Sequence, residues 1–494
     1  MTKPLILAID QGTSATKCLL VNEAGRVVAR GSAPLSEAHP HPGWVEQDAL
    51  AIWTSVQQAV CACLAGQDAA ALVGIGLSVQ RESAIAWDGA TGKPLAPLLS
   101  WQDQRTAARG EALRTPAHEQ LVREKSGLPL DPMFSALKMG WLLDTLDADR
   151  SAARAGRIRL GTVDAWLIAC LSGAHLIEAG NASRTQLLDV RKAAWDAELM
   201  ELFNVPRAAL PEVVASVGPF PAITGLPEVP AGTRLLSVMG DSHAALFAHG
   251  AYAPGQVKAT YGTGSSVMGL IERAASLESG LCNTIAWAID APALAAEGNI
   301  RASGATLKWT ADLLGVTPAE LAALGAKASS EGVVLVPGFN GLGAPWWDSG
   351  AVGLISNLTL GAGREALARA ALEAIVHQVT DVVEAMDRGV GRVERLHVDG
   401  GPTRNNMLMQ LQADIAGRPV LRANDAELSA LGVAHMAGLA AGVWSEGDLV
   451  ALRRDRDIFN AAMADDARAR ERAQWRRALA RARGEHVPAV EAMR

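Results

Sequence analysis

Short apolar runs with strand propensity alternate along this chain with segments of helical periodicity, and no other feature restricts the possible folds so strongly. In the segment 365–386, for example, Leu372, Ile375, Val379 and Val383 recur at the spacing of one helix face. Such alternation is typical of α/β domains, in which helices cover a sheet. We expect strands at residues 5–9, 17–21, 72–78, 235–239, 257–261, 333–336 and 396–398, and helices at residues 49–64, 365–386, 406–416 and 429–438.

A weak internal repeat indicates two related domains. The stretch AIDQGTSATKCLL near the start resembles ATYGTGSSVMGLI, which begins at Ala259, because each places a Gly-Thr turn and small hydroxyl residues between two apolar runs. Their separation of about 250 residues is too long for a solenoid repeat. Glycine and proline in the stretch ALFAHGAYAPGQVKA mark a boundary between the halves. We therefore predict domains at 1–250 and 251–450, followed by a charged, solvated helical extension at 451–494.

Length and composition exclude several classes of protein. With 494 residues the chain is long enough for more than one domain, and its net charge of −7 argues against a nucleic acid or a membrane surface as the main partner. Its five cysteines form no CxxC pair, which is typical of a reduced, cytoplasmic protein. The first residues lack the pattern of a signal peptide, and no run of about 18 apolar residues predicts a membrane span.

The first Gly-Thr bend carries side chains that folding alone does not require. Asp10 ends an apolar strand, and the bend Gly12-Thr13-Ser14 follows before the next strand. Backbone N–H groups in such a bend can bind a phosphate, a carboxylate at the strand end can hold Mg²⁺ through water, and Lys17 could offset phosphate charge. The simpler interpretation is a hairpin turn in which aspartate and serine bond the local backbone.

Two further turns could bind a nucleotide. Gly262, Thr263 and Gly264 follow a strand, and two glycines allow a ligand to approach the backbone closely. Near the C-terminus a strand ends at the pair Gly400-Gly401 before a helix opens, and a helix N-terminus behind such a turn is a ready anion site. Each has a simpler interpretation as an ordinary turn, because glycine is abundant here and Asp-Gly pairs form turns.

Three charged residues at strand ends are candidates for binding or deprotonating a substrate hydroxyl group. Asp241 stands where a strand meets a helix, and it is either a helix N-cap or a general base that takes a proton from a hydroxyl group. Arg81 and Glu82 follow an apolar strand, and they either bind a substrate hydroxyl or form an ordinary surface ion pair. The chain lacks the Walker A pattern and the protein-kinase motifs. The combination of turns and charges is what an ATP-dependent phosphotransferase with two lobes requires.

Long stretches of the sequence resemble the FGGY family of carbohydrate kinases and, within it, the glycerol kinases. The likeness covers roughly residues 5–445. The stretches that carry it are DQGT, QRESAIAWD, WQDQRT, SGLPLDPMFSALK, GTVDAWLI, NASRTQLLD, YGTGS, PGFNGLGAPWWD and VDGGPTRNNMLMQLQADI. Their order and spacing make a chance match negligible.

The resemblance implies an α/β fold of two actin-like, ribonuclease H-like domains with a ligand cleft between them. It implies that the protein uses ATP and Mg²⁺, that Asp241 is the catalytic base, and that Asp10 helps to hold the metal. The implied nucleotide-binding residues are Thr13, Ser14, Lys17, Gly262, Thr263, Gly304, Lys308, Gly401 and Asn405. The implied substrate-binding residues are Arg81, Glu82, Trp101, Met133, Ser242 and Ser266. Members of the family are often dimers or tetramers, so a homodimer and a homotetramer both stay open for this chain, and the sequence does not decide between them.

Some positions depart from the pattern of glycerol kinases. This chain has Met133 where they typically carry Tyr, Ser242 and Lys308 where they carry Gln, and Ser266 where they carry Phe. Three of these positions surround the expected substrate and predict a larger pocket with different hydrogen-bonding groups. Erythritol, a pentitol, xylulose or ribulose therefore stays open as the substrate beside glycerol, which the motifs QRES and WQDQRT favour.

A non-kinase alternative also stays open. Actin-like ATPases that act as chaperones or assembly proteins share the phosphate-binding turns of this fold. Arg81, Glu82 and Trp101 have no use in such a protein. The discriminating observation is whether ADP forms faster when polyols are added.

Overall fold

The computed structural model describes residues 3–485 and divides into two compact units. The N-terminal unit holds the chain up to Gly250 together with Cys282–Ala295 and Glu427–Arg453. The C-terminal unit holds Ala251–Leu281, Ala296–Ala426 and the chain from Arg454 onward. The boundary expected at residue 250 is therefore the place where the chain first leaves the N-terminal unit, and two later segments return to that unit.

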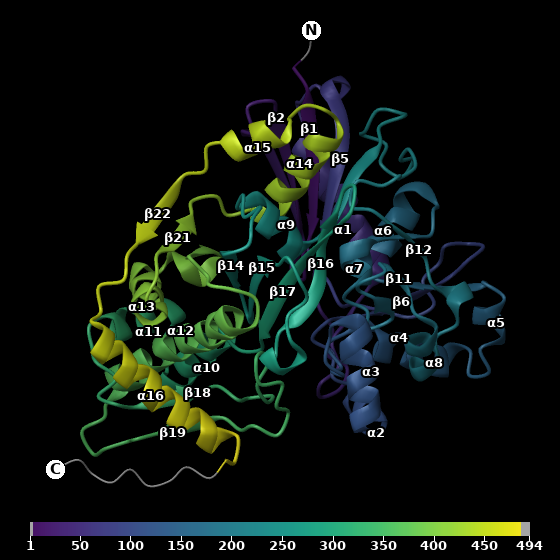
Figure 1. Ribbon diagram of the computed structural model, residues 1–494. Coiled ribbons are helices and arrows are strands. Elements are labelled where there is room, and N and C mark those ends of the chain that lie inside the picture. The colour runs from purple at the N-terminus through teal and green to yellow at the C-terminus, as the bar shows by residue number, and fades with distance from the viewer. Residues whose placement is uncertain (1–2, 486–494) are drawn as a thin grey trace. The chain divides into compact units, whose positions relative to one another are not determined.

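A five-stranded sheet forms the centre of the N-terminal unit (Figure 1). Its order is β13-β5-β1-β2-β3, formed by Leu235–Gly240, Leu72–Val79, Leu5–Gln11, Ala15–Asn22 and Val27–Pro34. Strand β2 pairs antiparallel with β1 and with β3, whereas β5 pairs parallel with β1 and with β13. The central strands are buried on both faces, which explains their unbroken apolar runs.

Helices cover both faces of this sheet. Helix α1 (Ala49–Leu64) packs in one core cluster with Leu7 and its neighbours on the first face. Helix α14 (Leu428–Ala440) lies against the other face, where a Cβ on Gly76 would be only 2.4 Å from the carbonyl oxygen of Val433. Such a close approach of helix to strand requires glycine at that point.

The C-terminal unit repeats this arrangement. Its sheet includes strands in the order β17-β15-β14-β20-β21-β22, formed by Pro292–Ile300, Ser265–Leu270, Gln256–Tyr261, Arg395–Asp399, Val420–Ala423 and Arg456–Phe459. Strands β14 and β15 form an antiparallel hairpin, and β20 and then β21 continue the sheet in parallel from β14. The hairpin of β1 and β2 occupies the same place in the first sheet. The internal repeat of the sequence is therefore a repeat of structure.

The elements predicted from periodicity are present. The predicted strands are β1, β2, β5, β13, β14, β18 (Val334–Val336) and β20, and the predicted helices are α1, α12 (Arg364–Gly389), α13 (Asn406–Ala416) and α14. Strand β3 lies outside these predictions. Its sequence VVARGSAP contains glycine and proline and leaves many residues exposed, because it lies at the edge of the sheet.

The C-terminal helix α16 (Asp465–Ala482) is packed against α12 instead of being solvated as expected. Trp475 is fully buried, and its Nε1 donates a hydrogen bond to the carboxylate of Asp381 at 2.8 Å. Arg472, also buried, donates to the same carboxylate at 2.5 Å. The charged composition hid a buried stripe at helical spacing, formed by Trp475, Ala478, Leu479 and Ala482. Residues 486–494 of the predicted extension lie outside the described part of the chain.

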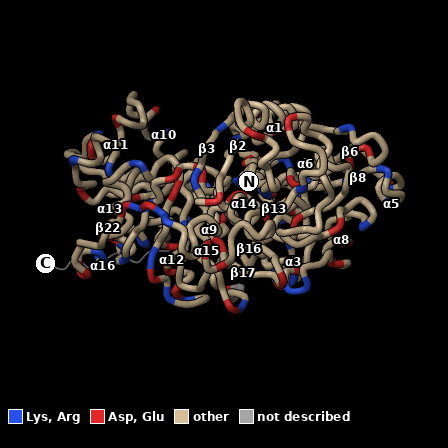
Figure 2. Tube along the Cα trace, turned by 90° about the horizontal axis from the view of Figure 1, so that it is seen from above, with Lys and Arg blue, Asp and Glu red and all other residues tan. Residues whose placement is uncertain are grey.

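Three further features of the described residues concern charge, membrane-spanning helices and cysteines. Lys and Arg, in blue, and Asp and Glu, in red, are interspersed along the trace of both units (Figure 2). Within residues 3–485 we find no helix with the length and hydrophobicity that a membrane span requires. All five cysteines are free thiols.

Candidate active site

The first Gly-Thr bend joins β1 to β2 and is held by a chain of glutamines. Gln80 donates to Gln47 at 2.7 Å and to Gln11 at 3.2 Å. Gln47 in turn donates to the carbonyl oxygen of Thr13 at 2.7 Å, and Gln11 donates to that of Gly12 at 2.8 Å. Because these carbonyls are held from the core, the backbone of the bend has a fixed conformation. A fixed backbone is what a phosphate-binding turn requires.

Asp10 is the second-last residue of β1, next to this bend, and its Oδ1 accepts a hydrogen bond from the Ser78 hydroxyl at 2.8 Å. Burial raises the pKa of Asp10 to about 6, and the negative charge of Asp241 contributes in the same direction. The hydrogen bond from Ser78 and the charge of Lys17 act against this rise. A carboxylate whose anion is so poorly stabilised favours a cation beside it.

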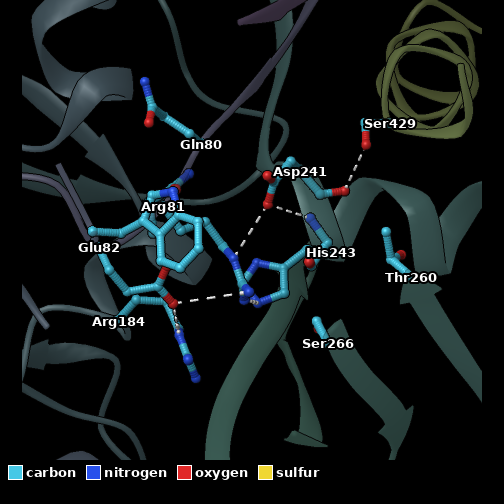
Figure 3. A network of polar contacts seen from close by, with 12 residues as sticks. Gln80, Arg81, Glu82, Arg184, Asp241, His243, Thr260, Ser266 and Ser429 are labelled. Atoms are coloured by element: carbon cyan, nitrogen blue, oxygen red, sulfur yellow. Dashed lines mark hydrogen bonds and ion pairs between the residues drawn. The ribbon is translucent and has the colours of Figure 1, made fainter. Parts of the chain in front are cut away.

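Asp241 is the first residue of helix α9 (Asp241–Ala248), directly after β13. Its Oδ1 accepts the Ser242 N–H at 2.6 Å and lies 3.4 Å from Nε of Arg81 (Figure 3). The Asp241 side chain is 40% exposed, whereas that of Arg81 is 4% exposed. Asp241 therefore bonds the first turn of its helix and still presents its carboxylate to a ligand.

Glu82 is held by Arg184, a residue that the sequence analysis did not single out. Nε of Arg184 donates to Oε1 of Glu82 at 2.6 Å, and Nη2 of Arg81 lies 3.8 Å from the same oxygen (Figure 3). All three side chains are buried, so the interpretation of Arg81 and Glu82 as a surface ion pair is wrong. Glu82 also has a φ of 55°, a strained conformation that costs about 1–3 kcal/mol and is typical of functional sites.

Trp101 and Met133, both expected beside the substrate, are tied to other parts of the N-terminal unit. Nε1 of Trp101 donates to Oγ1 of Thr13 at 3.3 Å. Nζ of Lys138 donates to the carbonyl oxygen of Met133 at 2.5 Å. Burial lowers the pKa of Lys138 to about 7, and nearby carboxylates that include Glu82 act against this shift. Lys138 thus holds the backbone at Met133, and its ammonium group lies close enough to Glu82 to be affected by that charge.

In the C-terminal unit, the turn between β14 and β15 contacts the start of helix α10 (Gly304–Leu314). The Gly304 N–H donates to the carbonyl oxygen of Gly262 at 2.9 Å, and the Ala305 N–H donates to that of Thr263 at 3.0 Å. A Cβ on Gly304 would lie 2.6 Å from the Gly262 oxygen, so only glycine fits there. The structure therefore brings together Gly262, Thr263 and Gly304, which the family resemblance implies for nucleotide binding.

The Gly-Gly turn lies beside the end of the same strand. Gly400 has a φ of 99°, and a Cβ there would lie 2.0 Å from the carbonyl oxygen of Tyr261, the last residue of β14. Gly401 then begins a 3₁₀ turn, and Asn405 caps helix α13 by accepting two N–H groups of its first turn. The two predicted nucleotide turns are thus neighbours at one edge of this sheet.

Two other predicted residues of the C-terminal unit have partners of their own. Lys308 is 73% exposed on α10 and forms an ion pair with Asp312 at 2.7 Å. Ser266 on β15 donates to Glu297 at 2.7 Å and accepts from Lys258 at 3.4 Å. Ser266 belongs to a different unit from the other expected substrate residues, so its role stays a prediction.

The donor groups of the N-terminal unit fit a magnesium ion that a nucleotide helps to hold. Among residues 3–485 no group of three or more histidine, cysteine, aspartate or glutamate side chains could hold a metal by itself. Asp10, however, lies close enough to Asp241 for the charge of Asp241 to raise its pKa. Magnesium needs only one or two carboxylates when waters and substrate phosphates complete its shell. The residues present therefore fit such an ion.

Family models match both halves of the chain. The N-terminal domain of the FGGY family of carbohydrate kinases matches residues 5–247, and the C-terminal domain matches residues 257–441. The chain is an FGGY carbohydrate kinase. This kinase is accordingly a phosphotransferase with an alcohol group as acceptor, as the motifs indicated, and the non-kinase alternative falls away.

Several relatives of this kinase match it over nearly its whole length. An apulose kinase from Pectobacterium atrosepticum is 41% identical over 98% of this chain and 99% of its own. A glycerol kinase from Aromatoleum aromaticum is 42% identical over 97% of this chain and 99% of its own. The crystal structure of Plasmodium falciparum glycerol kinase with ADP has a TM-score of 0.89 at 28% identity, and the match covers 97% of this chain and 98% of that one. The expected two-domain, actin-like α/β fold is thereby confirmed.

Sequence reasoning missed residues that hold the site together. Gln80, Lys138 and Arg184 stand inside the motifs QRESAIAWD, SGLPLDPMFSALK and NASRTQLLD, and each is a polar residue that the structure buries. The available signal was that these polar residues stand within the motifs that carry the family resemblance. Gln47 lies in none of the motifs, and only its contact with Gln80 shows its importance.

Proposed function

We propose that this kinase transfers the γ-phosphoryl group of ATP to a hydroxyl group of a polyol or sugar. The observation that carries the proposal is the partly exposed carboxylate of Asp241 beside the buried ions Arg81 and Glu82. A general base must be open to the acceptor, whereas the groups that orient the acceptor work best from a fixed, desolvated position.

The acceptor is oriented by hydrogen bonds to charged groups. Arg81 donates to one oxygen of the acceptor, and Glu82 accepts from a hydroxyl group. The hydrogen bond from Arg184 to Glu82 supports this role, because it fixes the carboxylate while one of its oxygens remains available. The indole of Trp101 provides an apolar surface for the carbon chain.

The chemical step needs one proton acceptor. Asp241 orients the attacking hydroxyl and takes its proton while the oxygen bonds to the γ-phosphorus of ATP. The bond between that phosphorus and the β,γ-bridging oxygen breaks, ADP leaves with the electron pair, and the acceptor becomes a phosphate monoester. Positioning and charge stabilisation account for most of the catalysis, because the transition state of phosphoryl transfer is loose. Magnesium, when bound near Asp10, offsets the charge of the phosphates.

The phosphoryl donor is recognised by the glycine turns. The proximity of Gly262, Thr263 and Gly304 and the packing of Gly400 on Tyr261 support a nucleotide site in the C-terminal unit. The relative from Plasmodium falciparum, whose structure holds ADP, supports an adenine nucleotide. In the N-terminal unit Thr13 and Lys17 contact the transferred phosphate. Ser14, Lys308, Gly401 and Asn405 remain predicted nucleotide contacts.

A second candidate is a kinase for an acceptor larger than glycerol, such as a four- or five-carbon polyol or a ketose. Met133, Ser242 and Ser266 favour it, because they stand at positions where glycerol kinases are expected to carry Tyr, Gln and Phe, respectively. The similarity to an apulose kinase at 41% identity points in the same direction.

A coupled assay of ADP formation tests both candidates. The panel contains glycerol, erythritol, the pentitols, xylulose, ribulose and a sample without acceptor. We expect ADP formation that depends on one acceptor class and equals the phosphate ester formed. ADP formation at the same rate with and without every acceptor would contradict the proposal. Glycerol as the best acceptor by kcat/KM would reject the second candidate only.

A further inference from the structure

His243 is buried on the first turn of α9 and contacts Arg81. Its Nε2 lies 3.2 Å from Nη1 of Arg81, while Nε of the same guanidinium lies 3.4 Å from Asp241 and Nη2 lies 3.8 Å from Glu82 (Figure 3). Each of the three guanidinium nitrogens therefore faces a different side chain. His243 contacts Nη1, whereas the ion pairs with Asp241 and Glu82 involve Nε and Nη2.

The protonation state of His243 follows from the chemistry of its partner. An arginine side chain carries only donors and stays charged in proteins. Nε2 of His243 must therefore present its lone pair to Arg81, and the proton of the neutral ring lies on Nδ1. A protonated ring would direct N–H against N–H and place two positive charges in contact. His243 thus acts as a neutral acceptor for a buried cation.

The backbone and the neighbouring hydroxyls hold this pair in place. A Cβ on Gly240 would lie 2.4 Å from Cδ of Arg81 and 3.1 Å from Nδ1 of His243. Both side chains therefore occupy space beside Gly240 that the side chain of a larger residue would fill. Oγ1 of Thr284 lies 3.5 Å from Nε2, and it is bonded at 2.8 Å to Oγ of Ser183. The ring has little freedom to leave Arg81.

We propose that His243 is a positioning residue that fixes the guanidinium of Arg81 beside Asp241 and Glu82. The inference rests on the proposed function, in which Arg81 binds the acceptor. Without a lone pair at the position of Nε2, Nη1 of Arg81 loses this acceptor, and the guanidinium can turn toward a carboxylate. Its orientation toward the acceptor is then lost. His243 itself touches neither the acceptor nor the phosphate.

The competing explanation is that His243 only fills space in the core. A space-filling residue is replaced adequately by an apolar side chain of similar size, and its loss lowers stability without a selective effect on acceptor binding. A positioning residue requires the acceptor atom, and its loss changes the Michaelis constant of one substrate. The two explanations therefore predict different results for leucine and glutamine at this position.

The first test compares His243→Leu with His243→Gln. Leucine fills the site without an acceptor atom, whereas the carbonyl oxygen of glutamine restores one. We expect the acceptor KM to rise about 10- to 100-fold in His243→Leu, on the scale of a lost hydrogen bond to a charged group, while the ATP KM stays within about threefold. We expect His243→Gln to recover most of this loss. His175→Leu, at another histidine of the same unit, serves as the control for lost packing. Equal impairment in the leucine and glutamine variants would overturn the proposal.

The second test is a double-mutant cycle with Arg81→Met. If His243 acts through Arg81, adding His243→Leu to Arg81→Met changes the acceptor KM by less than about threefold. Thermal unfolding checks that the variants fold. If they do, multiplication of the two single effects would overturn the proposal.

The outcomes separate this inference from the proposed function. If the wild type forms ADP in response to an acceptor and the effects of the two single substitutions multiply, only the role of His243 is overturned. A wild type that is inactive toward every acceptor overturns the proposed function. In that case, ¹⁵N spectra of histidine-labelled protein decide the contact by themselves, with the signal of His243 assigned by its loss in His243→Gln. An unprotonated Nε2 supports the contact, and a protonated Nε2 rejects it.

Discussion

Nε1 of Trp101 donates a hydrogen bond to Oγ1 of Thr13 over 3.3 Å, and this bond joins two segments that the sequence assigned to different ligands. Thr13 belongs to the bend expected to face the transferred phosphate, and Trp101 is expected beside the acceptor. The same hydroxyl lies 3.5 Å from Oε1 of Gln80, to which it donates its single proton. The indole therefore fixes which lone pair of Thr13 remains for a ligand.

Trp101→Phe keeps an aromatic surface and removes this donor. We expect kcat/KM to fall about 2- to 12-fold, because a neutral hydrogen bond contributes about 0.5–1.5 kcal/mol. Steady-state kinetics with the preferred acceptor measure the change. Trp166→Phe is the control, because its Nε1 bonds only a backbone carbonyl of the core at 3.4 Å. An unchanged kcat/KM in Trp101→Phe would show that Thr13 does not need the indole.

Asp241→Asn removes the proposed base and retains the shape of the side chain. We expect kcat to fall about 100-fold or more, the usual contribution of general base catalysis, while ADP binding stays within about twofold. Stopped assays measure the rate, and titration calorimetry measures nucleotide binding. Turnover close to the wild type would remove Asp241 from the mechanism.

Gly304→Ala tests the glycine turn of the C-terminal unit. The added Cβ would lie 2.6 Å from the carbonyl oxygen of Gly262, so the turn must shift. We expect the Kd for ADP to rise at least about tenfold, because displaced backbone no longer matches the nucleotide. Gly361→Ala in the same unit is the control, since its Cβ would meet no atom closer than 3.9 Å. Equal ADP affinity in the two variants would place the nucleotide elsewhere.

The pH dependence of stability has a contribution from His175. Burial lowers the pKa of His175 to about 4, and its Nε2 lies 2.9 Å from the carbonyl oxygen of Leu160. The unfolded chain, with a histidine pKa of about 6.5, binds a proton before the folded chain does, so this group supports full stability above pH 6.5 and destabilises the fold as the pH falls toward 4. The loss attributable to His175 reaches about 3 kcal/mol.

Denaturant unfolding of the wild type and of His175→Gln between pH 7.5 and about 4.5 measures this contribution. The neutral glutamine can still donate to the carbonyl of Leu160, so the difference between the two proteins isolates the titration. We expect the free energy of unfolding of the wild type to fall faster with acidification. Parallel pH profiles would contradict the low pKa of His175.

Trp475→Ala tests whether α16 is part of the C-terminal unit. Trp475 is fully buried, and it contributes both packing and the hydrogen bond to Asp381. We expect the free energy of unfolding to fall by about 3–5 kcal/mol, the usual cost of truncating a buried tryptophan. Trp309→Ala, at a residue 39% exposed on α10, is the control and should cost far less. Equal effects would show that α16 is dispensable.

Much of the fold could be predicted because its signals are local. Helices α1 and α13 begin and end where periodicity placed them, and strands β1 and β20 end at Gln11 and Asp399, directly before the turns that the glycines indicated. Residues in these patterns are close neighbours in sequence, so their spacing reports directly on the local backbone. The buried face of α16 was missed because charge on the other faces dominated the composition.

The sequence by itself determined the α/β class, the two related halves and the family, since apolar periodicity, glycine turns and long motifs are properties of contiguous residues. Only the tertiary structure decided which polar groups are partners. Gln80 meets Gln47, Arg184 meets Glu82 and His243 meets Arg81 across 33, 102 and 162 residues of chain. Burial makes such contacts obligatory, because a buried polar group without a partner is costly, but the identity of each partner depends on how the elements pack.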